Sequence, residues 1–379
     1  MRQHLTSYAD ALPLLLKRDA HQAMYRRCPA LMASVILNLE GDRHRERKRL
    51  MSPLFRRTSC QAIEAWLAQV LLPQLDNDWC GKPSLDLSSC TETVMLHVSG
   101  RMLGLGDLTF DAALLEWVSV FSASATAAQS ARHEDALNRM LDDALERFRE
   151  DYFDPAFDAA RPTRESDSLL PMLKAAWVGG QLDRSECVKE AAFFLQASLF
   201  STSNAAVHVF HELASWLEAN ESQRSRFVEE SLWAQRCVME ALRMHPASPV
   251  MIREFHGDQL EFDLVSINQD PEVFGTHAAI FWPDRPVRHL RSFSGLTFGA
   301  GHHSCPGREI AAGLVRTEKR PGDSTQIGVI TRMLKHWVAQ GMVRDPSRNA
   351  ERVQDTTRSN WATYPVKFEP GRAAVIQKG

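Results

Sequence analysis

Most of the chain repeats its apolar side chains with the period of about 3.6 residues that is typical of amphipathic helices. This pattern predicts a short helix over residues 8–16 and a long helix over residues 133–152. One face of the long helix should collect its apolar side chains, which are Leu137, Met140, Leu141, Leu145 and Phe148. Between residues 60 and 150, turn-forming residues break the helical pattern at 81–83 and 104–107. This part of the chain therefore predicts a bundle of helices.

A long segment without charge lies near the middle of the chain. Residues 191–211 contain no Asp, Glu, Lys or Arg, but they include several Ser, Thr, Asn and Gln side chains. That mixture is too polar for a lipid span and suits a helix buried inside the protein. Asp183, with Glu186 three residues later, has the form of a capping box and predicts where this helix begins. The helix should then run toward Ala219.

Two more helices are expected in the second half of the chain. The first covers residues 231–244 and is ended by Pro246. The second should resume over residues 327–340, because the Pro-Gly pair within residues 317–324 breaks any helix that precedes it. The tail from Asn349 should be irregular or weakly β.

Composition and charge narrow the class of protein. The 379 residues could form one large domain or two ordinary ones, and the 44% hydrophobic and 24% charged contents are those of a soluble globular protein. A net charge of −3 argues against general nucleic-acid binding. The 7 cysteines are scattered without a CxxC pair, which indicates a reducing compartment, and we expect the cytoplasm. The apolar run at residues 12–16 is too short for a secretory signal or a membrane span.

The richest candidate chemistry lies at residues 298–307. Gly299 and Gly301 precede Cys305, and Gly307 follows it. Glycine allows backbone to approach a ligand closely, and a thiolate needs nearby N–H donors or positive charge to stay ionised. The segment could also be a plain turn around a buried thiol. With His302 and His303 it could suggest zinc, although a second ligand pair at zinc spacing is missing.

This segment resembles the haem-ligand loop of the cytochrome P450 family. The family pattern is Phe, two residues, Gly, one residue, Arg or His, one residue, Cys, one residue, Gly. All of its positions are filled here, by Phe298, Gly301, His303, Cys305 and Gly307. The resemblance implies haem b as the cofactor, with the Cys305 thiolate as the axial ligand of the iron. Such a ligand pushes electron density onto the iron and favours cleavage of the O–O bond.

Other segments match the family in the same order along the chain. Residues 39–50 resemble the start of a helix whose His and Arg face the haem propionates, which implies that role for His44 and Lys48. Lysine in place of arginine is a departure, for which Arg47 or Arg49 could substitute. The alternative is a solvated basic face, which could also dock an acidic electron donor. Residues 249–253 and the cysteine loop imply that Arg253 and His303 also hold the propionates.

A charged network is implied by a further match. Glu240 and Arg243 fit the family's Glu-x-x-Arg, and Arg285 in residues 281–286 fits its third member. The spacing of three residues places the first two charges on one helical face, and a buried pair needs partners. A lone Glu-x-x-Arg occurs on many helix surfaces, so its value lies in its place before the cysteine loop. We expect the network to be structural.

The uncharged helix resembles the family's distal helix over the haem, with two departures. Phe200 stands where the family has an acid, and Ser201, followed by Thr202, stands where it has threonine. In the family the acid and the alcohol relay protons to dioxygen. The alternative is that Ser201 and Thr202 only bond to carbonyls of their own helix.

Together these matches predict a mainly α, cytochrome P450-like single domain over residues 1–379, with a reduced β-sheet. The family's β-rich N-terminal region is mostly missing, and the chain between Arg253 and Asn268 should be too short for the family's hairpin, leaving at most a residual strand over 259–266.

The implied activity is that of a monooxygenase that oxidises a small, largely apolar molecule, with dioxygen and electrons from a ferredoxin-type donor. The first alternative is an enzyme that uses peroxide, or that rearranges or dehydrates its substrate without oxygenation. The second is a haem-binding protein without turnover, such as a sensor or a degenerate homologue, because fold does not imply function.

Overall fold

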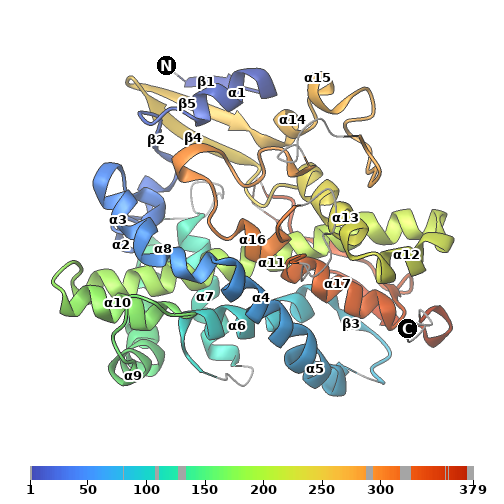
Figure 1. Cartoon of the computed structure of the whole chain (residues 1–379), viewed down its shortest axis with the longest axis horizontal. Helices are drawn as coiled ribbons and strands as arrows, with labels where there is room; N and C mark the ends of the chain where they lie inside the picture. The colour runs from blue at the N-terminus through green and yellow to red at the C-terminus, as the bar shows by residue number, and fades with distance from the viewer. Residues whose placement is uncertain are drawn as a thin grey trace.

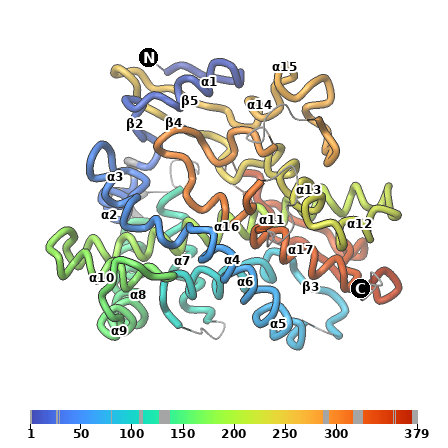
Figure 2. Tube along the Cα trace, viewed as in Figure 1, coloured from blue at the N-terminus to red at the C-terminus, as the bar shows by residue number. Residues whose placement is uncertain are grey.

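The computed structural model describes residues 2–79, 81–106, 111–126, 134–286, 293–315, 326–354, 356 and 358–373, and it is mostly helical (Figures 1 and 2). The α-helices are α1 Tyr8–Leu15, α2 Pro29–Met32, α3 Gly41–Met51, α4 Arg57–Trp66, α5 Leu72–Trp79, α6 Leu87–Leu103, α7 Ala112–Ala125, α8 Glu134–Phe148, α9 Asp154–Ala159, α10 Leu169–Val178, α11 Arg184–Ala219, α12 Arg224–Glu229, α13 Ser231–Met244, α14 Leu264–Asn268, α15 Pro271–Phe274, α16 Arg308–Ala312 and α17 Val329–Ala339. The strands are β1 Arg2–Leu5, β2 His21–Gln22, β3 Leu85–Asp86, β4 Val250–Phe255, β5 Asp258–Asp263, β6 Met342–Arg344, β7 Glu351–Arg352, β8 Trp361–Thr363 and β9 Pro365–Phe368.

The long helix α11 runs through the centre of the molecule (Figure 1). Its uncharged stretch is largely buried, because α6, α7 and α13 pack around it. The predicted capping box is confirmed, since the Asp183 carboxylate accepts from the Glu186 N–H at 2.7 Å and the Glu186 carboxylate accepts from the Asp183 N–H at 3.1 Å. Among the described residues, no helix is long and apolar enough to cross a membrane.

The prediction that the hairpin would be missing was wrong. Strands β4 and β5 form a complete antiparallel hairpin, and the four-stranded sheet has the order β1-β5-β4-β2. The turn consists only of His256 and Gly257, whose φ angles of 51° and 83° are both positive. Two-residue turns of this kind match the twist of the paired strands, so the connection needs very little chain. The N-terminal strands β1 and β2 are short but present, and they pair with β5 and β4.

The sheet and α1 enclose a small apolar core beside the cysteine loop. It contains Leu5, Leu15, Leu260 and Phe262, all at most 4% exposed. The loop fits against the end of α1 at Gly301, where φ is +72° and a Cβ would collide with the carbonyl oxygen of Leu15. Glycine is therefore required at this position by both the backbone angle and the close approach.

Most of the other predicted elements are present. The predictions for residues 8–16 and 231–244 are confirmed by α1 and α13, α17 lies within the predicted 327–340, and the tail forms the short strands β7 to β9. Residues 317–324 and His133 lie outside the described residues. Along α8, Leu137, Leu141 and Phe148 are buried as expected, but Met140 was wrongly predicted, since it is 54% exposed.

A buried histidine, His208, lies near the C-terminal end of the uncharged stretch of α11. The ring of His208 stacks on that of His245 at 4.8 Å between centroids, and His245 Nε2 lies 2.7 Å from a carboxylate oxygen of Glu212. Burial, together with the charges of His245 and Arg352, lowers the pKa of His208 to about 3. This side chain is therefore neutral in the folded protein at ordinary pH.

Candidate functional site

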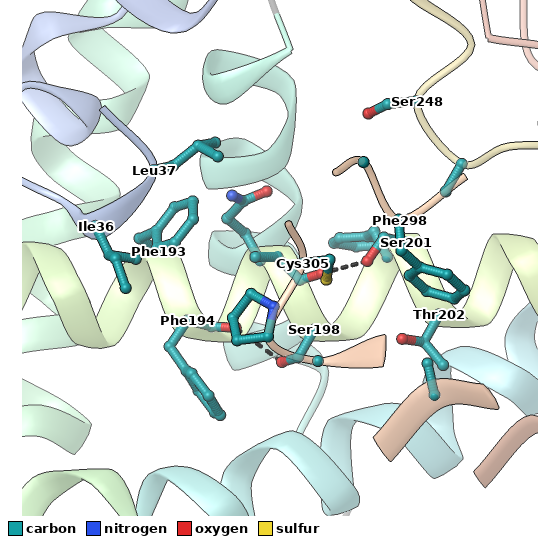
Figure 3. A pocket seen from close by; sticks show the side chains of 18 of the residues that line it. Ile36, Leu37, Phe193, Phe194, Ser198, Ser201, Thr202, Ser248, Phe298 and Cys305 are labelled. Atoms are coloured by element: carbon teal, nitrogen blue, oxygen red, sulfur yellow. Dashed lines mark hydrogen bonds between the residues drawn. The ribbon is translucent and has the colours of Figure 1, made fainter. Parts of the chain in front are cut away.

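A cavity of about 330 Å³ lies between α11, α3, the N-terminal segment and the cysteine loop, within the range of about 300–1,000 Å³ that ligand pockets occupy. Its walls are mostly apolar. Helix α11 contributes Phe193, Ala197, Ser201 and Ala205, which lie four residues apart and so share one face of the helix. Figure 3 shows side chains of α11 and of the cysteine loop meeting in this space.

Cys305 lines the cavity together with side chains of α11 (Figure 3). The exposed surface of Cys305 belongs to the lining of the cavity, and protein atoms surround the sulfur on its other sides. The Cys305 N–H donates to the Phe298 carbonyl at 2.8 Å, which closes the loop. Burial raises the pKa of the Cys305 thiol, while the N–H groups of Gly307 and Arg308 and the charge of Lys48 lower it.

Four basic side chains that the sequence singled out also line the cavity: His44, Lys48, Arg253 and His303. Lys48 donates to the His302 carbonyl at 2.8 Å, and the rings of His44 and His303 lie 4.5 Å apart. Burial, with the charges of His303 and Lys48, lowers the pKa of His44 to about 4. The structure therefore brings all four together at the edge of one space.

Arg253 is deeply buried, at 5% exposure. Its described hydrogen bond, to the Ile252 carbonyl, is long at 3.5 Å, and no carboxylate of the described residues lies within 4.0 Å of its guanidinium. Burial lowers the pKa of Arg253, although the nearby Tyr25 and Glu40 act in the opposite direction. A buried cation in this state suits a ligand that carries a carboxylate.

Glu40 is a site residue that the sequence did not reveal. His303 Nε2 lies 3.0 Å from Glu40 Oε2, and the Gln22 N–H donates to Oε1 at 2.7 Å. Burial alone would raise the pKa of Glu40, but the contacts with His303, the Gln22 N–H and His21 together outweigh it and lower the pKa to about 2. The carboxylate therefore fixes one nitrogen of His303, and Nδ1 is left buried without a hydrogen-bond partner among the described residues.

The zinc alternative is not supported by this arrangement. The ligand atoms of Glu40, His302 and His303 lie within 4.8 Å of one another, but the Cys305 thiol is not part of that group. The cations Lys48 and Arg253 lie beside it. Two fixed positive charges oppose the binding of a metal cation at this place.

The polar face of α11 is engaged within its own helix. The Ser201 hydroxyl donates to the Ala197 carbonyl, and the amide of Asn204 donates to the Phe200 carbonyl at 2.8 Å. Phe200, Ser201 and Thr202 all line the cavity, and none of the described lining residues is an Asp or Glu. For Ser201 the structure thus shows the alternative in which the hydroxyl bonds back to its helix.

Comparisons with known proteins agree with this geometry. A family model described as Cytochrome P450 matches residues 204–313. The chain is 26% identical over 199 residues to eupatolide synthase of Helianthus annuus, a match that covers 48% of this chain and 39% of that protein. It is 24% identical over 179 residues to Cytochrome P450 52C1 of Candida tropicalis, covering 41% and 34%. The matches thus span about two fifths or less of the length of these curated relatives.

Solved structures extend the likeness to nearly the whole chain. The crystal structure of CalO2 has a TM-score of 0.78 at 18% identity and covers 97% of this chain and 91% of its own. That of P450BioI with an acyl carrier protein has a TM-score of 0.76 at 17% identity and covers 97% and 92%. Over residues 204–313 the chain therefore resembles cytochrome P450s in sequence, and over nearly its whole length it resembles them in fold. Its mainly α fold with small sheets is the cytochrome P450 fold, as the sequence predicted.

A cytochrome P450 implies a haem, and the residues present fit that group. The thiol of Cys305 meets an apolar cavity, and the buried guanidinium of Arg253 and the unpartnered Nδ1 of His303 suit its two carboxylates. The suggested substitutes for Lys48 do not reach this site. Arg47 forms a buried ion pair with Glu190, and Arg49 is exposed.

The residues of the charged network do not line the cavity. Arg243 donates to both carboxylate oxygens of Glu240 at 2.8 Å, and Arg285 Nε donates to Oε1 at 3.0 Å. Arg285 also donates to the carbonyls of Phe274, His277 and Ile280 at 2.7 to 2.8 Å. The carboxylate is thus fully paired and buried.

Proposed function

We propose that this protein is a haem-thiolate oxidoreductase in which residues 1–379 form one domain that holds haem b with Cys305 as the ligand of the iron. The observation that carries the proposal is the Cys305 thiol, which faces an apolar cavity rimmed by His44, Lys48, Arg253 and His303. A thiolate needs N–H donors and positive charge nearby, and the Gly307 and Arg308 amides and Lys48 supply them, although burial raises the pKa of the Cys305 thiol by more.

When bound, such a haem supplies electron transfer and the activation of dioxygen, with the thiolate favouring cleavage of the O–O bond. The protein residues do the rest. The four basic side chains would hold the haem carboxylates, Glu40 orients His303, and Phe200 keeps water from its part of the cavity. Ser201 and Thr202 follow Phe200 on α11, and both line the cavity. Their hydroxyl groups would therefore deliver protons from this part of the helix.

We infer a monooxygenase that oxidises a small, largely apolar molecule, because the cavity walls are apolar and the family carries out this chemistry. Electrons would come from a ferredoxin-type donor. The exposed arginines Arg43, Arg45 and Arg49 on α3 suit the docking of an acidic protein. The described cysteines are free thiols, which suits a reducing compartment such as the cytoplasm.

A second function is favoured by one specific observation. Phe200 replaces the acid of the distal helix, the Ser201 hydroxyl bonds to Ala197, and no described lining residue is an Asp or Glu. An enzyme that uses peroxide, or that rearranges or dehydrates its substrate, does not need this proton route. A haem-binding protein without turnover would not need it either.

One experiment separates the three. The haem-loaded protein is mixed in single-turnover assays with a library of small apolar compounds, once with a reduced ferredoxin-type donor and oxygen, once with hydrogen peroxide alone, and once with neither. Oxygenated product with donor and oxygen supports the monooxygenase. Product only with peroxide, or an isomerised or dehydrated product with no oxidant, supports the second function. Absence of product in every arm supports binding without turnover.

A further inference from the structure

The ionisable side chains that line the cavity in the described part of the chain include five bases and no acid. The bases are His44, Lys48, Arg253, His303 and Arg358. A cavity lined by bases and apolar side chains attracts anions. The proposed haem brings two carboxylates, and the question is whether all of these bases are needed for them.

Four of the five bases gather around the cysteine loop. Lys48 donates to the His302 carbonyl at 2.8 Å, and the ring centroids of His44 and His303 lie 4.5 Å apart. Burial and the charges of His303 and Arg253 lower the pKa of His302. These four bases are the groups assigned above to the haem carboxylates. Arg358 is the exception, because it comes from the segment between β7 and β8.

Arg358 lies with two hydroxyl groups from segments that are far away in the sequence. Its Nη2 donates to Ser248 Oγ at 3.3 Å, and the Tyr25 hydroxyl lies 3.5 Å from the same Ser248 oxygen. Ser248 precedes β4, and Tyr25 belongs to the short helical turn Met24–Arg27. All three side chains line the cavity, and we call them the Arg358 corner. Figure 3 shows Ser248 well apart from Cys305 in this view.

The chemistry of the Arg358 corner suits a carboxylate. A guanidinium offers paired N–H donors that match the two oxygens of a carboxylate, and two hydroxyls beside it can donate as well. The remaining walls offer apolar contacts, among them Met24, Ile36, Leu37 and Met251. A ligand that satisfies both parts is an apolar molecule with one carboxylate.

We propose that the Arg358 corner binds the carboxylate of the substrate, so that the substrate class is an apolar carboxylic acid whose hydrocarbon part extends toward Cys305. This inference rests on the proposed function, because it takes the cavity as a substrate site. It assigns to Arg358 a role in substrate choice, separate from the role of Arg253 in holding haem.

The test compares two probes that differ only in their end group, dodecanoic acid and 1-dodecanol. Calorimetric titration of the haem-loaded protein measures the dissociation constant of each, in the parent and in Arg358→Met, Arg358→Lys and Arg348→Met. Arg348 is exposed on the same C-terminal segment and serves as the matched control. The parent and Arg348→Met should bind the acid about 10 to 100 times more tightly than the alcohol. Arg358→Met should lose that preference, and Arg358→Lys should keep part of it.

Three results would overturn the inference. The first is equal binding of acid and alcohol by the parent, and the second is an unchanged preference in Arg358→Met. The third is loss of haem from Arg358→Met as fast as from Arg253→Ala, which would place Arg358 among the haem-holding residues. Because these measurements do not read turnover, they are independent of the proposed activity. Acid selectivity without any turnover would overturn only the activity, whereas turnover of neutral compounds without acid selectivity would overturn only the Arg358 corner.

Discussion

Arg243 donates two hydrogen bonds of 2.8 Å to the carboxylate of Glu240, from Nε to Oε2 and from Nη2 to Oε1. Both side chains are almost completely buried, and Arg285 holds the same carboxylate from the loop that follows α15. These three residues therefore connect α13 to the loop after α15, which precedes the cysteine loop in the sequence. None of its members lines the cavity, so its role should be structural.

Glu240→Ala should destabilise the protein by about 3–5 kcal/mol, because it strands two buried guanidinium groups. The expected outcome is insoluble protein or a much lower urea midpoint, with poor haem loading. Glu229→Ala, at an exposed acid on the neighbouring α12, should leave the midpoint unchanged. A Glu240→Ala protein that folds and loads haem like the parent, and loses only turnover, would disprove the structural role.

Cys305→Ala should abolish the red-shifted Soret band that thiolate ligation gives to the reduced carbon monoxide adduct. The reason is that Cys305 is the cysteine whose sulfur faces the cavity. Cys187→Ala, which removes a buried thiol bonded to the Leu173 carbonyl, should keep the band. An unchanged spectrum in Cys305→Ala would remove this residue from the metal site.

Arg253→Ala should release haem at least about tenfold faster than the parent, because a charge-assisted hydrogen bond to a carboxylate is lost. Transfer of haem to apomyoglobin gives the rate. Arg253→Lys should lie between the two, since lysine keeps the charge but not the paired geometry. The thiolate spectrum should be intact in both variants, as it should be after single substitutions of His44, Lys48 and His303. Equal release rates in Arg253→Ala and the parent would exclude Arg253 from the haem site.

Phe200→Glu should raise the yield of product per reduced cofactor consumed, because it restores a carboxylate where the family carries one. Positioned proton transfer contributes about a hundred- to ten-thousand-fold in rate. The parent should couple poorly with simple apolar ligands. Phe194→Glu places the same charge in the same cavity, earlier on α11, and should not improve coupling. Tight coupling in the parent, with no gain in Phe200→Glu, would mean that protons arrive by another route.

His208 should make the protein sensitive to acid. Its pKa is about 3 in the folded state and about 6.5 in the unfolded state. As the pH falls below about 6.5, only the unfolded chain takes up this proton, so stability is lost by up to about 1.4 kcal/mol per pH unit. The loss should cease once the pH has passed the folded value. Its contribution is fully present above the unfolded pKa.

His208→Phe keeps an aromatic ring against His245 and removes the titration. The free energy of unfolding should therefore fall less steeply between pH 6.5 and 3 than in the parent, when measured by urea titration. His277→Gln, at an exposed histidine, should follow the parent curve. Parallel curves for His208→Phe and the parent would show that this ring is not the acid-sensitive group.

The sequence could predict what local pattern and motif order determine. Short local segments determine the capping box at Asp183, the limits of α13 and the position of Cys305. The hairpin was missed because the signal for a two-residue turn is only His256-Gly257, and counting residues could not show how little chain the turn needs. Met140 was misplaced because periodicity does not show how wide the covered face of a helix is.

Within the site, the residues that sequence reasoning missed depend on tertiary contact. Glu40 lies in residues 39–50, the same segment that contains His44. Its contact with His303, however, joins two distant parts of the chain. The Arg358 corner joins three such parts, one of them from a tail for which the sequence predicts only irregular or weakly β structure. The bond from Ser201 to Ala197 is local, but the choice between it and the cavity depends on a rotamer that no motif encodes.

The fit of Gly301 against Leu15 has a consequence for how the protein is made. Leu15 leaves the ribosome long before Gly301, which emerges only after α11, α13 and the hairpin. The end of α1 must therefore wait for its partner through most of synthesis, and β1 likewise waits for β5. The cysteine loop can be completed only when these early and late segments meet. Capture of the proposed haem would then be a late event that depends on the assembly of both parts, and a nascent chain that stalls before the hairpin would lack the proposed site.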